Sequence, residues 1–287
     1  MRYGETPVFI TCRDRLSSLL PMLSWLEQAG HNRIILVDNA STHPPLREFL
    51  ERTTHTVVRL DRNLGQLAAW ESGAVRKYAS NEWYVVSDPD IVPTEDCPAD
   101  AVAYFREVLE RYPLYVKAGF GLRIDDLPAC YKHARDVRSW ERQFFWQPFG
   151  RNLYHASIDT TFALYRPYND GFQFAHGPAI RTGRPYLARH LPWYTDSSNP
   201  TEEELYYAKH ARADVTTWSQ AALPKDFERG LVQIPRWSMR QRLNWRLYLL
   251  LGMKGSPDED RVGRFVNGMP HPARACLRVV KRLIAGR

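Results

Sequence analysis

Two acidic residues, Asp88 and Asp90, stand two positions apart directly after the apolar run at 83–87. Two carboxylates at this spacing can hold a hard divalent cation such as Mn²⁺ or Mg²⁺ and leave coordination positions open for phosphate oxygens. The same motif also occurs in ordinary capped turns, so by itself it does not decide between a metal site and a turn. Its weight comes from the segments that surround it in the chain.

Further polar residues follow other short apolar runs, which the pattern predicts to be strands at 7–12, 33–38, 56–60 and 83–87. Helical spacing of apolar residues between them predicts intervening helices, and this alternation is typical of parallel βαβ units. Ligands of such sheets bind at the carboxyl ends of the strands. Loops are polar in general, which would explain one or two of the residues there, but we expect the whole set to meet in one cleft: Thr11, Arg13, Asp38, Asn39, Asp88 and Asp90.

Length and composition indicate a large globular domain. Of the 287 residues 44% are hydrophobic, and no apolar run approaches the roughly 18 residues that a membrane-spanning helix requires. The first residues become polar after a short apolar stretch, which argues against a signal peptide. The four cysteines are widely spaced without a CxxC pair, so they indicate neither a zinc knuckle nor a disulfide framework. We therefore expect a cytoplasmic protein.

Four segments resemble, in order and approximate spacing, the nucleotide-sugar-binding half of GT-A-fold glycosyltransferases, especially glycosyltransferase family 2. They read VFITCRDR, IILVDNAST, RNLGQLAAWESG and YVVSDPD, and the resemblance covers about residues 6–125. It implies an α/β, Rossmann-like GT-A fold, with a mostly parallel sheet flanked by helices. It also implies transfer of a sugar from a nucleoside diphosphate donor, first of all a UDP-sugar, to an acceptor hydroxyl with Mn²⁺ or Mg²⁺.

Carried over residue by residue, the resemblance implies a nucleotide-binding set of Thr11, Arg13, Asp38, Asn39, Asn63, Gly65, Gln66 and Asp88. Within it, Asp38 would accept a hydrogen bond from the base, and the glycine of the Asn-x-Gly turn would let the backbone approach the ligand. Asp88 would hold ribose or sugar hydroxyls, and together with Asp90 it would bind the metal. Trp70 departs from the smaller residue usual in the family, which leaves the donor sugar open.

A histidine and an acid in the second half complete the candidate site. His190 resembles the late histidine that completes the metal shell in many GT-A enzymes, and neutral imidazole suits Mn²⁺. Inverting transfer needs a carboxylate base to deprotonate the acceptor hydroxyl. Asp159 is the first choice, because it is an acid within an otherwise apolar strand predicted over 154–165.

Each of these two assignments has a structural alternative. His190 can be an ordinary structural histidine, and Asp159 can be an internal acid bonded to nearby backbone or to Arg166. The acidic pair that the family usually has before its acceptor helix is not obvious. Its nearest substitutes are Asp196 and the glutamates at 202–204, for which solvated capping of a helix that begins after Thr201 is the competing role.

The positive charge is concentrated at the carboxyl end. Residues 231–287 contain 12 Lys and Arg against 3 Asp and Glu, whereas residues 1–230 contain 27 against 29. Apolar and basic residues separate onto two faces of a predicted helix at 271–287, and such a helix can lie on an anionic membrane. It can equally pack on the catalytic domain. We therefore predict a GT-A catalytic domain at 1–230, with a nucleotide-sugar-binding half at 1–125 and an acceptor-side half at 126–230, and a basic helical extension at 231–287.

The charge distribution argues against nucleic acid as a partner and allows peripheral attachment to the inner face of the cell membrane. The acceptor would then be lipid-linked, and otherwise a saccharide. Two alternatives remain. A nucleotidyltransferase can share the topology and the metal carboxylates, but it usually has a glycine-rich loop after the first strand, and residues 13–18 contain no glycine. A non-catalytic peripheral membrane protein on a GT-A-like scaffold would depend on its tail and tolerate Asp90→Ala.

Overall fold

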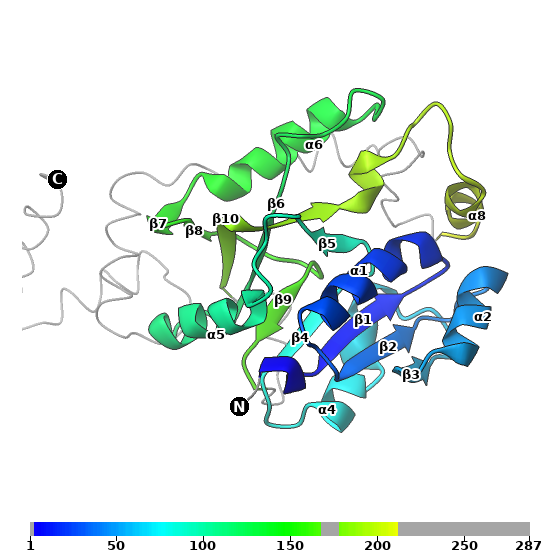
Figure 1. The fold of residues 1–287 in the computed structure, drawn as a ribbon, viewed down its shortest axis with the longest axis horizontal. Helices are drawn as coiled ribbons and strands as arrows, with labels where there is room; N and C mark the ends of the chain where they lie inside the picture. Colours follow the sequence, from blue (N-terminus) through cyan, green and yellow to red (C-terminus); the bar gives the residue numbers. More distant parts are fainter. Residues whose placement is uncertain (1–2, 168–177, 212–287) are drawn as a thin grey trace, which may run out of the picture. The chain divides into compact units, whose positions relative to one another are not determined.

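The computed structural model describes residues 3–167 and 178–211, so the predicted basic extension lies outside the described residues. The amino-terminal half forms a parallel sheet in the order β3-β2-β1-β4 (Figure 1). Its strands are β1 (Val8–Cys12), β2 (Ile34–Asp38), β3 (Thr56–Arg59) and β4 (Tyr84–Ser87). Every residue of β1, β2 and β4 is buried, which is why these strands are continuous apolar runs.

The second half extends this sheet with antiparallel pairings. β9 lies between β4 and β6 and runs antiparallel to both, and β10 pairs in parallel with β6. The other edge of β10 pairs with β8 and with β5, and β8 pairs with β7. The bounds are β5 (Ile91–Pro93), β6 (Lys117–Leu122), β7 (Pro148–Gly150), β8 (Leu153–His155), β9 (Ala163–Tyr165) and β10 (Ala179–His190). The expected α/β class with flanking helices is confirmed, and the sheet, which was expected to be mostly parallel, is mixed in the described residues.

Helices occupy most of the connections. They are α1 (Leu16–Gln28), α2 (Pro44–Arg52), α3 (Ala68–Glu71), α4 (Ala74–Tyr78), α5 (Ala101–Arg111), α6 (Ala134–Glu141) and α8 (Glu202–His210). Short 3₁₀ helices are η1 (Tyr3–Glu5), η2 (Gly65–Leu67), η3 (Arg142–Phe145) and η4 (Leu191–Tyr194). Over residues 3–167 and 178–211, no helix is long and apolar enough to cross a membrane.

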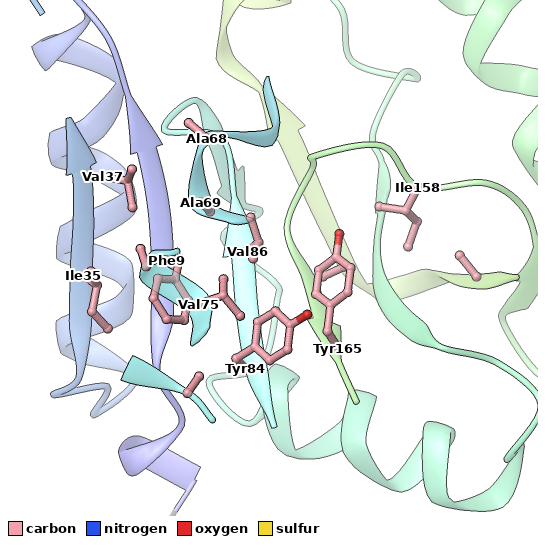
Figure 2. Close-up of a cluster of buried hydrophobic side chains, with 14 residues drawn as sticks. Phe9, Ile35, Val37, Ala68, Ala69, Val75, Tyr84, Val86, Ile158 and Tyr165 are labelled. Carbon is pink, nitrogen blue, oxygen red and sulfur yellow. The ribbon is translucent and has the colours of Figure 1, made fainter. Parts of the chain in front are cut away.

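An aromatic cluster joins the two halves of the sheet beneath α3 and α4 (Figure 2). Tyr84 on β4 and Tyr165 on β9 are stacked, with ring centroids 5.3 Å apart, and Phe9 on β1 meets Tyr84 edge-on at 6.2 Å. Trp70 packs edge-on against Tyr165, and its indole N–H donates to the Tyr84 hydroxyl over 3.2 Å. The large side chain at position 70 therefore contributes to the core that supports β4 and β9.

One predicted strand is wrong. The apolar segment 154–165 is divided into β8 and β9, which are separated by a loop at 156–162. β8 pairs with β10 and β9 pairs with β4 and β6, so the chain must leave one part of the sheet before it enters another. Hydrophobicity alone does not reveal this break, because Ile158 and Phe162 are buried although they lie outside the strands.

A half-buried histidine on β8 makes stability depend on pH. His155 Nδ1 lies 3.1 Å from the Tyr115 hydroxyl oxygen, and burial lowers the pKa of His155 from 6.5 to about 4. Between these values the unfolded chain binds a proton that the folded chain does not, so this histidine makes the free energy of unfolding fall as pH falls from 6.5 to 4. The pKa difference corresponds to about 3 kcal/mol at most.

We therefore expect urea unfolding at pH 7, 5.5 and 4 to show a smaller acid-induced loss of stability in His155→Gln than in wild type. Substitution of the exposed His210 by glutamine serves as the control and should leave the wild-type pH dependence in place. Identical pH dependence in wild type and His155→Gln would contradict the assignment.

Candidate active site

The carboxyl ends of the parallel strands form the edge where the sequence placed its candidates (Figure 1). Thr11 is the last residue but one of β1, Asp38 ends β2, and Asp88 follows β4 directly. His190 reaches the same place from the second half, because the end of β10 pairs with the start of β5 and sets His190 opposite Ile91. These residues therefore lie at one edge of the sheet, and their meeting in one ligand-binding cleft stays a prediction.

Asp90 is the most enclosed carboxylate of the acidic pair, with 7% of its surface exposed. Its Oδ2 accepts a hydrogen bond from Arg15 Nη1 at 3.0 Å, and its Oδ1 lies 3.6 Å from His190 Nε2. Burial lowers the pKa of His190, and the opposing pull of Asp90 is smaller, so the imidazole is neutral at pH 7. Among the described residues Asp90 Oδ1 is buried without a hydrogen-bond partner.

Asp88 is connected to the loop before β9. Its Oδ2 accepts a hydrogen bond from Thr160 Oγ1 at 2.7 Å, and its backbone N–H donates to Thr160 O at 3.0 Å. Burial raises the pKa of Asp88 well above its usual range, and the negative charges of Asp90 and Asp159 raise it further. Three carboxylates thus lie within electrostatic reach of one another, an arrangement that favours a positively charged ligand.

The donor set fits a divalent cation that takes most of its ligands from a substrate. Within the described parts of the chain, no three His, Cys, Asp or Glu side chains are grouped closely enough to hold a metal by themselves. Mg²⁺ and related ions in phosphate-transfer sites are usually bound through one or two carboxylates plus substrate phosphates. The orphaned oxygen of Asp90 beside a neutral imidazole supplies such a partial site, and Asp88 stands next to it.

The predicted nucleotide-binding side chains divide into two groups. Thr11 Oγ1 is buried without a hydrogen-bond partner in the described structure, so it is available to a ligand. Asp38 uses Oδ1 to accept from Ser41 N at 2.9 Å. The guanidinium of Arg13 donates to the carbonyl oxygens of Asn39 and Ala40 at 2.7 and 2.8 Å, and therefore holds the turn after β2.

A second group stabilises the turn that follows β3. Asn39 Nδ2 donates to Asn63 Oδ1 at 2.8 Å and to Gly65 O at 3.0 Å, while its Oδ1 accepts from Leu64 N at 2.7 Å. Gly65 has φ +79°, which favours glycine. The side chain of Gln66 is exposed. Asn39, Asn63 and Gly65 are thus engaged with one another, and direct binding of a nucleotide by this set stays a prediction.

The structural context predicted for Asp159 is wrong, because the residue lies in the loop between β8 and β9 and its side chain is exposed. Asp159 Oδ1 accepts from Thr161 N at 3.1 Å, a local turn contact, whereas Arg166 donates to the carbonyl oxygens of Tyr115 and Leu109 instead. The burial argument that favoured Asp159 therefore fails. Its place beside the acidic pair is retained, since its charge raises the pKa of Asp88.

Sequence reasoning missed Arg15. In addition to its ion pair with Asp90, its guanidinium lies 3.9 Å from the centre of the Tyr207 ring on α8. The sequence does not distinguish Arg15 from Arg13, because either arginine of Arg-Asp-Arg fits a motif that follows the first strand. Asp14 between them has φ +54° and accepts from the backbone N–H groups of Thr42 and His43 at 2.5 and 2.7 Å, which directs Arg13 and Arg15 to different partners.

Helix α8 is attached to the start of α1 by the carboxylate of Glu203. This group accepts hydrogen bonds from Leu16 N at 2.8 Å and Ser17 N at 3.1 Å, and from the Ser17 hydroxyl. Free N–H groups at a helix start favour an anionic partner. The expected N-cap of α8 is confirmed, since Thr201 and Glu204 cap each other's backbone N–H groups.

Two cavities flank the sheet. One of about 370 Å³ lies between the start of α1 and the η4–α8 segment and is lined by Arg15, Asp196 and Glu203 among others. The other, of about 390 Å³, surrounds His31 and His55 at the amino-terminal edge of the strands, away from every candidate named above. The first cavity is the one that adjoins Asp90, through Arg15.

A parallel βαβ sheet with an acidic pair after β4 and a histidine brought beside it places the chain among α/β proteins whose candidate site lies at the carboxyl ends of the strands. Residues 8–116 match the sequence model of glycosyl transferase family 2, which confirms the resemblance over the segment from β1 to the residue before β6. No curated protein matches the chain.

Two solved structures are similar to this chain. One is the mannosyltransferase PcManGT from Pyrobaculum calidifontis in complex with GDP-Man and Mn²⁺, at 14% identity over 98% of this chain and 85% of that one, with a TM-score of 0.43. The other is glucosyl-3-phosphoglycerate synthase from Mycobacterium tuberculosis in complex with phosphoglyceric acid, at 13% identity over 50% of this chain and 60% of that one, with a TM-score of 0.32.

Proposed function

We propose that the protein is a glycosyltransferase that moves a sugar from a nucleoside diphosphate donor, a UDP-sugar, to the hydroxyl of an acceptor. The observation that carries the proposal is the buried Asp90 Oδ1, which has no hydrogen-bond partner among the described residues and lies beside the neutral His190, at the strand edge of a segment that matches the family. A carboxylate and an imidazole at this edge suit a cation that also binds a diphosphate.

In the proposed mechanism, different side chains bind the nucleoside, bind the cation and accept the proton. Thr11 and Asp38 bind the nucleoside, and Asp90 and His190, with Asp88, would hold Mn²⁺ or Mg²⁺. When bound, this ion neutralises negative charge on the leaving diphosphate. The acceptor oxygen forms a bond to the anomeric carbon as the bond from that carbon to the diphosphate oxygen breaks on the opposite face. The hydroxyl proton passes to the Asp159 carboxylate, so transfer is inverting.

We further propose that the domain division at 230 and the membrane role of residues 231–287 hold as expected from the sequence. The acceptor is then a saccharide or lipid-linked saccharide, and the protein works in the cytoplasm at the inner face of the membrane. The support is the basic amphipathic pattern of the tail. Removal of residues 231–287 should therefore spare transfer to a soluble acceptor.

Calorimetric titration with UDP, with GDP as the comparator, tests the donor site directly. We expect UDP to bind wild-type protein in the presence of Mn²⁺ and to bind at least tenfold more weakly without it, because the diphosphate charges then lack their counterion. Tighter binding of GDP than of UDP would show that the donor nucleotide carries guanine rather than uracil. If neither nucleotide binds well-folded protein with Mn²⁺, the glycosyltransferase proposal is wrong and the tail should be examined with lipid vesicles.

A further inference from the structure

Two buried cations contact the loop 156–162, and the proposed mechanism uses neither. Lys117 on β6 is fully buried, and Arg181 on β10 has 3% of its surface exposed. Arg181 Nη1 forms an ion pair with Glu141 at 2.8 Å, and its guanidinium lies 4.0 Å from the centre of the Phe144 ring. Burying a charge is costly unless hydrogen bonds or a partner compensate for it. An apolar residue at either position would avoid that cost.

Together the two cations donate hydrogen bonds to the carbonyl oxygens of three consecutive loop residues. Arg181 Nε donates to Ser157 O at 2.8 Å, and Lys117 Nζ donates to Ile158 O at 2.5 Å and to Asp159 O at 3.4 Å. The Tyr165 hydroxyl also donates to Asp159 O at 3.4 Å. Hydrogen bonds from charged donors are stronger than neutral ones. The backbone on which the Asp159 carboxylate is mounted is therefore fixed from the core.

The same loop is fixed on its other side to the acidic pair. The Thr160 hydroxyl donates a hydrogen bond to Asp88 Oδ2, and the Thr160 carbonyl oxygen accepts one from the Asp88 backbone N–H, so the residue after Asp159 is bonded to the segment after β4. The Asp159 side chain is exposed, and its Oδ1 accepts a hydrogen bond from Thr161 N. Backbone contacts, rather than contacts of the carboxylate, set the position of Asp159.

We propose that Lys117 and Arg181 are positioning residues, which fix the carbonyl groups of Ser157–Asp159 and thereby aim the Asp159 carboxylate at the acceptor hydroxyl. The inference rests on the proposed transferase function with Asp159 as its base. It also predicts a pH effect, because a neutral amine is a weaker donor than an ammonium group.

The groups that face Lys117 are Asp159 from the loop, Arg181 from β10 and Tyr165 from β9. Burial lowers the pKa of Lys117 to about 8, Arg181 adds to the lowering, and Asp159 opposes it. In the wild type the rate of transfer should therefore fall as pH rises above about 8, where the ammonium group loses its proton.

Lys117→Met tests the proposal against Arg166→Met. Arg166 is a matched control, because it is a partly buried cation that also donates to two backbone carbonyls, those of Tyr115 and Leu109, away from the loop. We expect Lys117→Met to lower kcat at least tenfold, to leave KM for the nucleotide sugar within twofold, and to remove the decline above pH 8. Arg166→Met should keep kcat within twofold. Equal kcat losses in both variants would overturn the proposal.

Hydrogen exchange provides a readout that does not depend on turnover. Amides of residues 156–162 should exchange at least tenfold faster in Lys117→Met, and also in Arg181→Lys, which keeps a positive charge beside Glu141 but lacks Nε. They should be unchanged in Arg166→Met. Unaltered exchange in both loop variants would overturn the positioning role. Faster exchange in a protein whose wild type transfers no sugar would overturn the proposed function instead.

Discussion

Asp90→Asn is expected to lower the rate of sugar transfer by roughly a thousandfold and to remove the Mn²⁺ dependence of nucleotide binding. The substitution keeps the shape of the side chain but removes the charge of the oxygen that lies beside His190. A thousandfold corresponds to about 4 kcal/mol, within the several kcal/mol that a bound cation supplies to a charged leaving group. Initial rates with saturating nucleotide sugar, and UDP titrations with and without Mn²⁺, measure both effects.

Two controls separate this loss from a general disturbance. Asp90 also pairs with Arg15 in a buried position, so the melting temperature of Asp90→Asn must be measured beside its activity. Asp125→Asn removes another arginine-paired carboxylate, which lies on the surface and contacts Arg184 at 2.7 Å, and it should leave the rate within twofold. Near-normal turnover in Asp90→Asn would mean that this carboxylate does not hold the ion.

The parallel half of the fold could be predicted because each of its strands can be recognised from a short segment of the sequence. Each of β1, β2 and β4 is an apolar run that ends at a polar residue, and parallel topology brings such ends together without any knowledge of side-chain contacts. Asp38 and Asp88 were therefore placed at the right edge from the sequence. Asp38 and Asp88 lie at the same edge of the sheet because the alternation of strands and helices makes these strands parallel.

The rest of the site depends on pairings between distant segments, for which the sequence carries little signal. His190 lies beside Asp90 because β10 pairs antiparallel with the short β5. Glu203 caps a helix that begins 187 positions earlier, and the role of Arg15 becomes visible only when its contact with Asp90 is seen. Asp159 was selected for burial in a strand that does not exist, because a loop with buried apolar residues has the same composition as a strand.

The identity of the base can be decided between two aspartates in similar local settings. Asp159 Oδ1 accepts from the backbone N–H two residues later, and Asp196 Oδ1 accepts from Ser198 N in the same way at 2.9 Å. Replacement of either by asparagine keeps an oxygen for that turn contact and removes only the basicity. Asp159 affects the pKa of Asp88, whereas Asp196 lines the cavity beside Arg15.

We expect Asp159→Asn to lower kcat by about a thousandfold, within the range for loss of a general base, and to leave UDP affinity with Mn²⁺ unchanged. Asp196→Asn should retain kcat within threefold. Single-turnover rates and UDP titrations on both variants distinguish the outcomes. The reverse pattern would assign the base to Asp196 and locate the acceptor in the cavity between α1 and α8. Because the backbone carbonyls that Lys117 and Arg181 hold belong to the Asp159 loop, their proposed positioning role would then fail as well, while the donor site at Asp90 would be untouched.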